Sequence, residues 1–123
     1  MTKSGTTSKS SPEIGDIVLL PLPFSDQSGA KQRPVLVVAH ADAQGDFIAV
    51  PVTSQPGNDH TVDLDTPGLR EGKMPKPSWI KADKPYTLHR SLILKRFGAV
   101  RQDILTRVQE KLAQRLGLGG HTA

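Results

Sequence analysis

The stretch that most constrains the fold is residues 15–39, GDIVLLPLPFSDQSGAKQRPVLVVA. It holds two apolar runs, Ile17–Leu20 and Val35–Val38, separated by a polar loop that contains glycine. Both runs are short, contain β-branched residues and are bounded by turn-forming residues, which favours buried strands over a helix. Pro34 lacks a backbone N–H, so it suits the first position of a strand or an edge. We therefore predict two strands, with Arg33 at the entrance to the second.

Further segments extend this pattern. Apolar or alternating residues predict strands at Phe47–Val52, His60–Asp65, Ser78–Ala82 and Leu92–Phe97. Thr66–Pro77 contains several prolines and glycines and is predicted to be a long surface loop. Short strands joined by glycine- and proline-containing turns are typical of a small β-barrel.

The segment 103–116 has the period of a helix. Ile104, Val108, Leu112 and Leu116 recur every four residues, which places an apolar stripe on one helical face. The sequence thus predicts a mainly β chain with a C-terminal α-helix that closes the barrel.

The 123 residues allow one domain with one modest core. Residues 1–12 are polar and are expected to form a disordered arm, followed by a single domain at 13–118 and a flexible tail at 119–123. The absence of cysteine excludes a disulfide framework, a thiolate zinc site and a cysteine nucleophile. No apolar run reaches the roughly 18 residues of a membrane span, and the N-terminus lacks a secretory h-region. A soluble, cytoplasmic protein is expected.

The formal net charge of +4 favours a polyanionic partner such as nucleic acid or an acidic protein. A small basic domain that merely stays soluble has the same charge, so charge alone leaves both interpretations open. The four histidines are scattered without metal-ligand spacing, and no metal or other cofactor is expected.

The order of several short motifs resembles the MazF/PemK family of toxin endoribonucleases of type II toxin–antitoxin systems. The motifs are GDIV, the later RPVLVV, VPVTS at 50–54, IKADKPYTL at 80–88 and the closing helix, so the resemblance covers 14–118. It implies an SH3-like barrel that forms a homodimer and a metal-independent cleavage of single-stranded RNA, including mRNA, through a 2′,3′-cyclic phosphate. Such cleavage inhibits translation and growth. It also implies a cognate antitoxin whose acidic, largely disordered tail folds onto the basic groove.

The resemblance implies that Arg33 and Thr53 are catalytic. A guanidinium is always charged and its planar donors suit the phosphorane that forms during RNA cleavage. A surface ion pair between Arg33 and Asp16 or Asp26 is the structural alternative. The Thr53 hydroxyl can donate to a phosphate oxygen, whereas for Ser54 the better interpretation is that it caps the following turn.

The resemblance also draws attention to Lys81 and Asp83, because some relatives have an arginine and an aspartate at this spacing that act as acid and base. Their alternation with inward-facing neighbours predicts that both side chains project from one strand face. Lysine cannot form the bidentate phosphate contacts of arginine, and a free aspartate is a weak base at neutral pH. A solvated ion pair remains the alternative, and Asp26 or His89 could then supply the base.

Candidate RNA-binding residues flank this set. Aromatic rings stack on the bases of single-stranded RNA, and Trp79 has equal claims to base stacking and to packing in a dimer interface. The full set of candidate RNA-binding residues is Phe24, Ser28, Lys31, Ser54 and Trp79.

Two other functions remain open. One is a barrel with a decayed site that binds RNA or an antitoxin without cutting, which the lysine at position 81 keeps under consideration. The other is a gyrase poison, because the CcdB toxins share the fold implied by the resemblance. A protein that only wedges a partner needs no phosphate-binding residues, so the set around Arg33 disfavours this second alternative.

Overall fold

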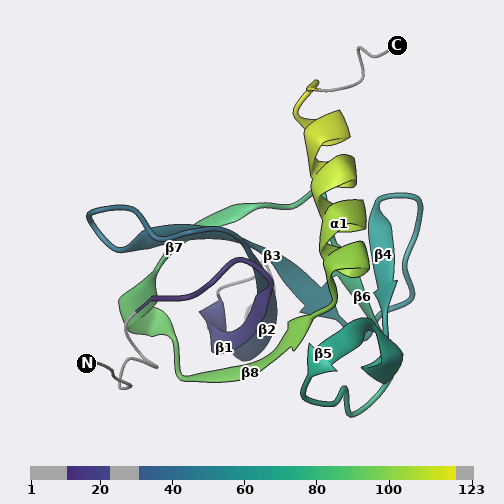
Figure 1. Ribbon diagram of the computed structural model, residues 1–123, viewed down its shortest axis with the longest axis horizontal. Coiled ribbons are helices and arrows are strands. Elements are labelled where there is room, and N and C mark those ends of the chain that lie inside the picture. The colour runs from purple at the N-terminus through teal and green to yellow at the C-terminus, as the bar shows by residue number, and fades with distance from the viewer. Residues whose placement is uncertain (1–10, 23–30, 119–123) are drawn as a thin grey trace.

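A computed structural model describes residues 11–22 and 31–118 of the chain. Within these residues it contains eight β-strands, two short 3₁₀-helices and one α-helix (Figure 1). In chain order they are β1 (Asp16–Leu22), β2 (Lys31–Ala39), β3 (Asp46–Thr53), β4 (Thr61–Leu64), η2 (Thr66–Gly68), β5 (Leu69–Glu71), β6 (Ser78–Lys81), β7 (Tyr86–His89), η3 (Arg90–Leu92), β8 (Lys95–Val100) and α1 (Gln102–Arg115).

All recorded strand pairs are antiparallel, in the order β4-β6-β3-β2-β1-β8-β5, and β7 also pairs with β3. In Figure 1 the sheet curls, so that β7 and β8 arch around β1 and β2, while α1 stands beside β4 and β6. The predicted class, a mainly β chain with a C-terminal helix, is confirmed. The predicted arm at 1–12 and tail at 119–123 fall almost entirely outside the described residues.

The central strands are buried on both faces, which explains why their sequences are continuous apolar runs. One face of β1, β2 and β3 contributes Ile17, Leu36 and Val50 to a cluster that also includes the buried residues of α1. The opposite face contributes Val35 and Phe47, among others, to a second cluster closed by β7. Two apolar layers on one curled sheet therefore hold the barrel together.

The helix α1 packs only its first half on the sheet. Ile104, Leu105 and Val108 are buried against the first cluster, whereas Leu116 is 58% exposed. The predicted apolar stripe is thus confirmed in the first half of the helix, whereas its last residue, Leu116, lies outside the core. Asp103 lies in the first turn of α1, where a carboxylate favours the positive end of the helix dipole.

The structure differs from the predicted strands in three places. The predicted loop at 66–77 contains η2 and the short strand β5, and Tyr86–His89 forms β7, which was not predicted. The strand expected at 92–97 begins at Lys95, because Arg90–Leu92 form η3. Each missed strand has at most four residues and is paired with a distant part of the chain, so local periodicity gave no signal for it.

A buried charge joins β1 to the far edge of the sheet. Asp16 is 4% exposed, accepts the backbone N–H of Glu13 at 2.9 Å, and pairs with Nε of Arg96 on β8 at 3.0 Å. Arg96 also donates to Glu71 of β5. Among the described residues, no helix is long and apolar enough to cross a lipid bilayer.

Candidate active site

Arg33 and Thr53 lie just beyond the paired part of two neighbouring strands. The recorded pairing of β2 with β3 runs from Val35 opposite Pro51 to Ala39 opposite Ile48. Proline has no N–H to donate, so Pro51 beside the end of this ladder weakens further pairing. Beyond this ladder Arg33 pairs with Leu20 of β1 and Thr53 pairs with Trp79 of β6, and both residues line a hollow at this point of the sheet.

Arg33, Thr53 and Lys81 line one pocket of about 510 Å³, which we call the Lys81 pocket. Arg33 is half-buried, and Lys81 is exposed at the end of β6. Three polar groups from three strands therefore converge, two of them cationic. The remaining lining residues are Pro51, Val52, Gln55, Lys84 and Tyr86.

Thr53 has a second contact that fixes its hydroxyl. Its Oγ1 accepts the backbone N–H of Gln55 at 3.1 Å. The turn-capping role considered for Ser54 is thus performed by Thr53, while Ser54 is exposed. Because the Thr53 oxygen acts as the acceptor in this bond, its own proton remains available for a further acceptor such as a phosphate oxygen.

A second pocket, of about 260 Å³, adjoins the first and shares Arg33, Val52 and Thr53 with it. We call it the Phe97 pocket. Its other lining residues are Leu19, Gln32, Pro34, Ser54, Met74, Pro75, Lys76, Ser78 and Phe97.

Asp83 lies apart from these pockets within one chain. β6 ends at Lys81, and the chain turns there, with the N–H of Lys84 donating to the carbonyl of Lys81 at 3.2 Å. The half-buried Asp83 lines a third pocket together with His60 of the β4 approach and Lys111 of α1. The predicted common strand face for Lys81 and Asp83 is therefore not found, because the strand ends between them.

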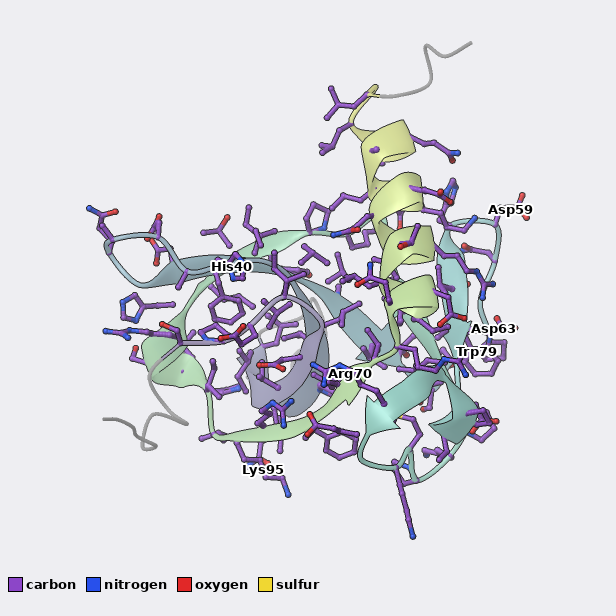
Figure 2. The ribbon with its side chains drawn as sticks, in the orientation of Figure 1. His40, Asp59, Asp63, Arg70, Trp79 and Lys95 are labelled. Atoms are coloured by element: carbon purple, nitrogen blue, oxygen red, sulfur yellow. The ribbon has the colours of Figure 1, made fainter. Side chains whose placement is uncertain are left out.

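Trp79 lies on β6 opposite Thr53 on one side and Asp63 on the other. Figure 2 shows Trp79 and Asp63 together at the β4–β6 side of the molecule. A Cβ added at Gly57 would come within 2.5 Å of the indole Cδ1, so the ring packs closely on the 55–60 loop. Among the described residues, Trp79 lines neither pocket next to Arg33.

The other candidate RNA-binding residues lie in or beside the β1–β2 connection. Phe24 and Ser28, with the alternative base Asp26, are outside the described residues. Lys31 is the first residue of β2 and pairs with Leu22 through the backbone. Its side chain also lies outside the described part of the chain.

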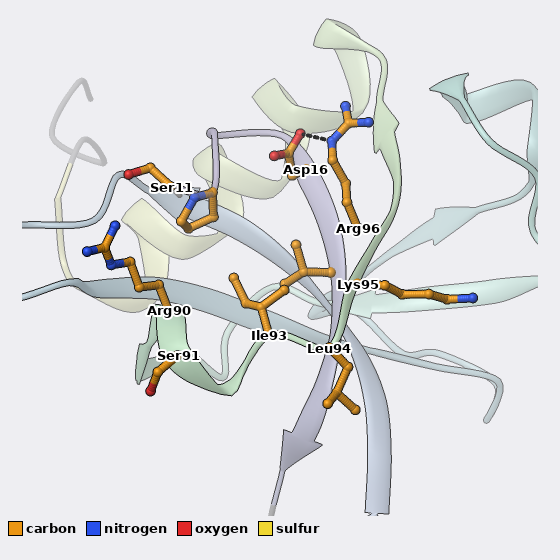
Figure 3. Close-up of a pocket in the computed structure, with 10 residues that line it drawn as sticks. Ser11, Asp16, Arg90, Ser91, Ile93, Leu94, Lys95 and Arg96 are labelled. Carbon is orange, nitrogen blue, oxygen red and sulfur yellow. Dashed lines mark hydrogen bonds and ion pairs between the residues drawn. The ribbon is translucent and has the colours of Figure 1, made fainter. Parts of the chain in front are cut away.

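The alternative role of Arg33 was a surface ion pair with Asp16 or Asp26, and Asp16 has another partner. Asp16 is engaged by Arg96 (Figure 3), in a separate hollow formed with η3 and the start of β8. The hydrogen bond and charge of Arg96 lower the pKa of Glu71, and the Glu71 carboxylate correspondingly raises the pKa of Arg96. This network stabilises the β1–β8–β5 edge.

Several residues that line the two pockets are not among the residues predicted from the sequence. Lys84 and Tyr86 belong to the IKADKPYTL motif, so their position in that motif was the signal for them. For Gln32 the signal was its position directly before Arg33 in the sequence. Met74 and Phe97 had none, because only the folded chain brings β8 and the 72–77 loop next to β2.

The fold and site together define a small antiparallel barrel with a closing helix and a cationic pocket where two strands end. The family model described as PemK-like, MazF-like toxin of type II toxin–antitoxin system matches residues 13–116. This chain belongs to that family.

Solved structures agree with this assignment. MazF from Deinococcus radiodurans is 26% identical, with a TM-score of 0.70 over 87% of this chain and 97% of that one. MazE–MazF from the same organism gives 28% identity and a TM-score of 0.70 over 88% and 97%. A mycobacterial endoribonuclease in complex with its cognate antitoxin is 22% identical, with a TM-score of 0.66 over 88% and 95%, and supports the fold alone. A comparison with curated protein sequences found no significant match.

Proposed function

We propose that this toxin is an endoribonuclease that cuts single-stranded RNA, including mRNA, at a short sequence and thereby inhibits translation and growth. The observation that carries the proposal is the convergence of Arg33, Thr53 and Lys81 on one pocket. A polyanionic backbone suits such a pocket, since phosphate oxygens are good acceptors for guanidinium, ammonium and hydroxyl donors. The family assignment supports the same activity.

The proposed reaction is a transesterification that needs no metal. The ribose 2′-oxygen attacks the adjacent phosphorus and loses its proton to a base. The bond from phosphorus to the 5′-oxygen breaks, and that oxygen takes up a proton, leaving a 2′,3′-cyclic phosphate and a 5′-hydroxyl. In this proposal Arg33 stabilises the negative charge of the phosphorane and protonates the leaving oxygen, while Thr53 holds a non-bridging oxygen. Lys81 adds a positive charge on the same phosphate.

The group that activates the 2′-hydroxyl is assigned to Asp83. Lys81 and Lys84 line the pocket on either side of the turn that contains Asp83, although the carboxylate itself faces the helix side in a single chain. In this proposal Asp83 acts on a phosphate bound at the subunit boundary of a homodimer, or orients the turn that presents the two lysines.

The proposed partners follow from charge and from the relatives. The chain carries a net charge of +4, and related MazF proteins crystallise with MazE. We propose a homodimer whose basic groove also binds the acidic, disordered tail of a cognate antitoxin, which folds on binding.

A binding module without cleavage is the second candidate. Two observations favour it: lysine occupies position 81, and Asp83 lies outside the pocket shared by Arg33 and Thr53 within one chain. Such a protein would bind RNA or the antitoxin through its cations and leave the RNA intact.

Incubation of a defined single-stranded RNA with the protein in EDTA separates these functions. Cleavage with 2′,3′-cyclic phosphate and 5′-hydroxyl ends supports the proposed enzyme. Binding without cleavage selects the module. Absence of both, with gyrase trapped on DNA, selects a CcdB-like poison.

A further inference from the structure

The two pockets beside Arg33 differ in chemistry. The Lys81 pocket carries two lysines in addition to Arg33. The Phe97 pocket has mainly apolar walls, formed by Leu19, Met74, Pro75 and Phe97, with a single lysine at position 76. In a nucleotide chain the phosphate binds to cations, whereas the base is a flat, weakly hydrated ring that stacks on aromatic and apolar groups.

The wall of the Phe97 pocket is held in place by its own contacts. Met74 is only 8% exposed, and its backbone N–H donates to Oγ1 of Thr66 at 3.1 Å. Ser78 Oγ donates to the carbonyl of Lys76 at 3.1 Å, which ties the other end of the wall to β6. Phe97 packs partly against the first apolar cluster. A ligand entering this pocket therefore loses little binding free energy to ordering the protein.

Gln32 brings hydrogen-bonding capacity to the rim of this pocket. It is exposed on β2, one residue before Arg33 in the chain, and lines the Phe97 pocket. Its amide both donates and accepts, which is the capacity needed to read the edge of a base. Lysine and arginine at phosphates position a nucleic acid but carry no sequence information.

We infer that the Phe97 pocket binds the nucleobase next to the phosphate held by Arg33, and that Gln32 is the residue that reads the edge of this base. The inference rests on the proposed function and adds a location for its sequence selectivity. In this arrangement the Lys81 pocket binds the RNA backbone on the other side of the cleaved bond. Arg33 and Thr53 lie between the two, because they line both pockets.

The test is cleavage of a randomised RNA pool, with the ends mapped by sequencing. Gln32→Ala is expected to lower the base preference at one position adjacent to the cut by about 5- to 150-fold, with preferences elsewhere retained. Gln109→Ala removes the same side chain from the exposed surface of α1 and serves as the matched control, with the wild-type pattern expected.

Two outcomes of this test overturn the inference. One is a Gln32→Ala pattern identical to that of the wild type, and the other is an equal loss of preference at every position. If the wild type cleaves nothing, the proposed function fails separately, and selection from a randomised 2′-O-methyl RNA pool that resists cleavage decides the inference. There too, Gln32→Ala must lose its preference at one position, and unchanged selection rejects the pocket as a base site.

Discussion

Arg33 owes its environment to its neighbours in sequence and in space. Pro34 follows it directly, and the β2–β3 ladder begins only at Val35 opposite Pro51. Arg33 therefore lies beyond that ladder, while its backbone pairs with Leu20 of β1. It is half-buried and lines two pockets at once. In the proposed reaction this guanidinium meets the phosphate already held in place, and a fixed positive charge is what an enzyme gains most from at a developing anion.

Arg33→Ala is expected to lower RNA cleavage by at least about 100-fold, because it removes the main stabilising charge of the phosphorane. Its melting temperature should stay close to that of the wild type, since the side chain is not part of either apolar cluster. Arg107→Ala, on the exposed side of α1, is the control and should cleave normally. A large loss of melting temperature with activity retained would reassign Arg33 to folding.

Asp83→Asn tests the proposed base. The substitution keeps the size of the side chain and removes its ability to take up a proton, so the cleavage rate should fall far more than RNA affinity. Single-turnover rates and binding to an uncleavable RNA measure the two separately. Unchanged turnover would move the role to Asp26 or His89.

At the scale of elements, β5 shows how a short strand is stabilised by its partner. Its three residues pair with β8, where a Cβ at Gly98 would come within 2.5 Å of the Glu71 carbonyl oxygen, so glycine is needed for this close approach. The side chains of Glu71 and Arg96 add an ion pair across the same two strands.

The Glu71 pair predicts a pH dependence of stability. Arg96 lowers the pKa of Glu71, first through its hydrogen bond and then through its charge. A group whose folded pKa is lowered stabilises the fold above its unfolded pKa and loses that contribution as the pH falls through the folded value. The wild type should therefore be more stable than Glu71→Gln at about pH 7, and the difference should shrink towards about pH 3. Thermal melts of both proteins across this range measure it, and a difference independent of pH would contradict the assignment.

The two ends of α1 differ in their contribution to stability. Leu105→Ala should lower the free energy of unfolding by about 2–5 kcal/mol, because it leaves a cavity in the first apolar cluster. Leu116→Ala makes the same change at a 58% exposed site and should stay within about 0.5 kcal/mol of the wild type. Urea denaturation compares them. Equal losses would mean that Leu116 is covered in solution, as a homodimer contact would require.

For the whole molecule, the net charge of +4 and the lysines beside Arg33 predict salt-sensitive RNA binding. For single strands, each neutralised phosphate adds about −0.7 to the slope of log K against log salt. Lys84→Ala should make this slope shallower by about 0.7. Arg107→Ala removes one positive charge from the exposed side of α1 and should leave the slope unchanged. Equal effects of the two variants would show that only net charge matters.

The sequence predicted those parts of the fold and site that depend on local pattern. The apolar runs of β1, β2 and β3, the alternation of β4 and the period of α1 are properties of neighbouring residues, so strands and helix were found with errors mainly at their ends. The order of short motifs was sufficient to indicate the family, and Arg33 and Thr53 were singled out from those motifs. β5 and β7 were missed because each is short and depends on a partner strand far away in the chain.

By itself, then, the sequence determined the class of fold and the family, and it singled out Arg33 as a candidate, since each is written in short local motifs. Only the tertiary structure decided which side chains share a pocket. It placed Lys81 with Arg33, turned Asp83 towards α1, and brought Phe97 and Met74 to the rim of β2. The physical reason is that pocket neighbours are set by strand pairing and chain reversal between distant segments, which local periodicity does not encode.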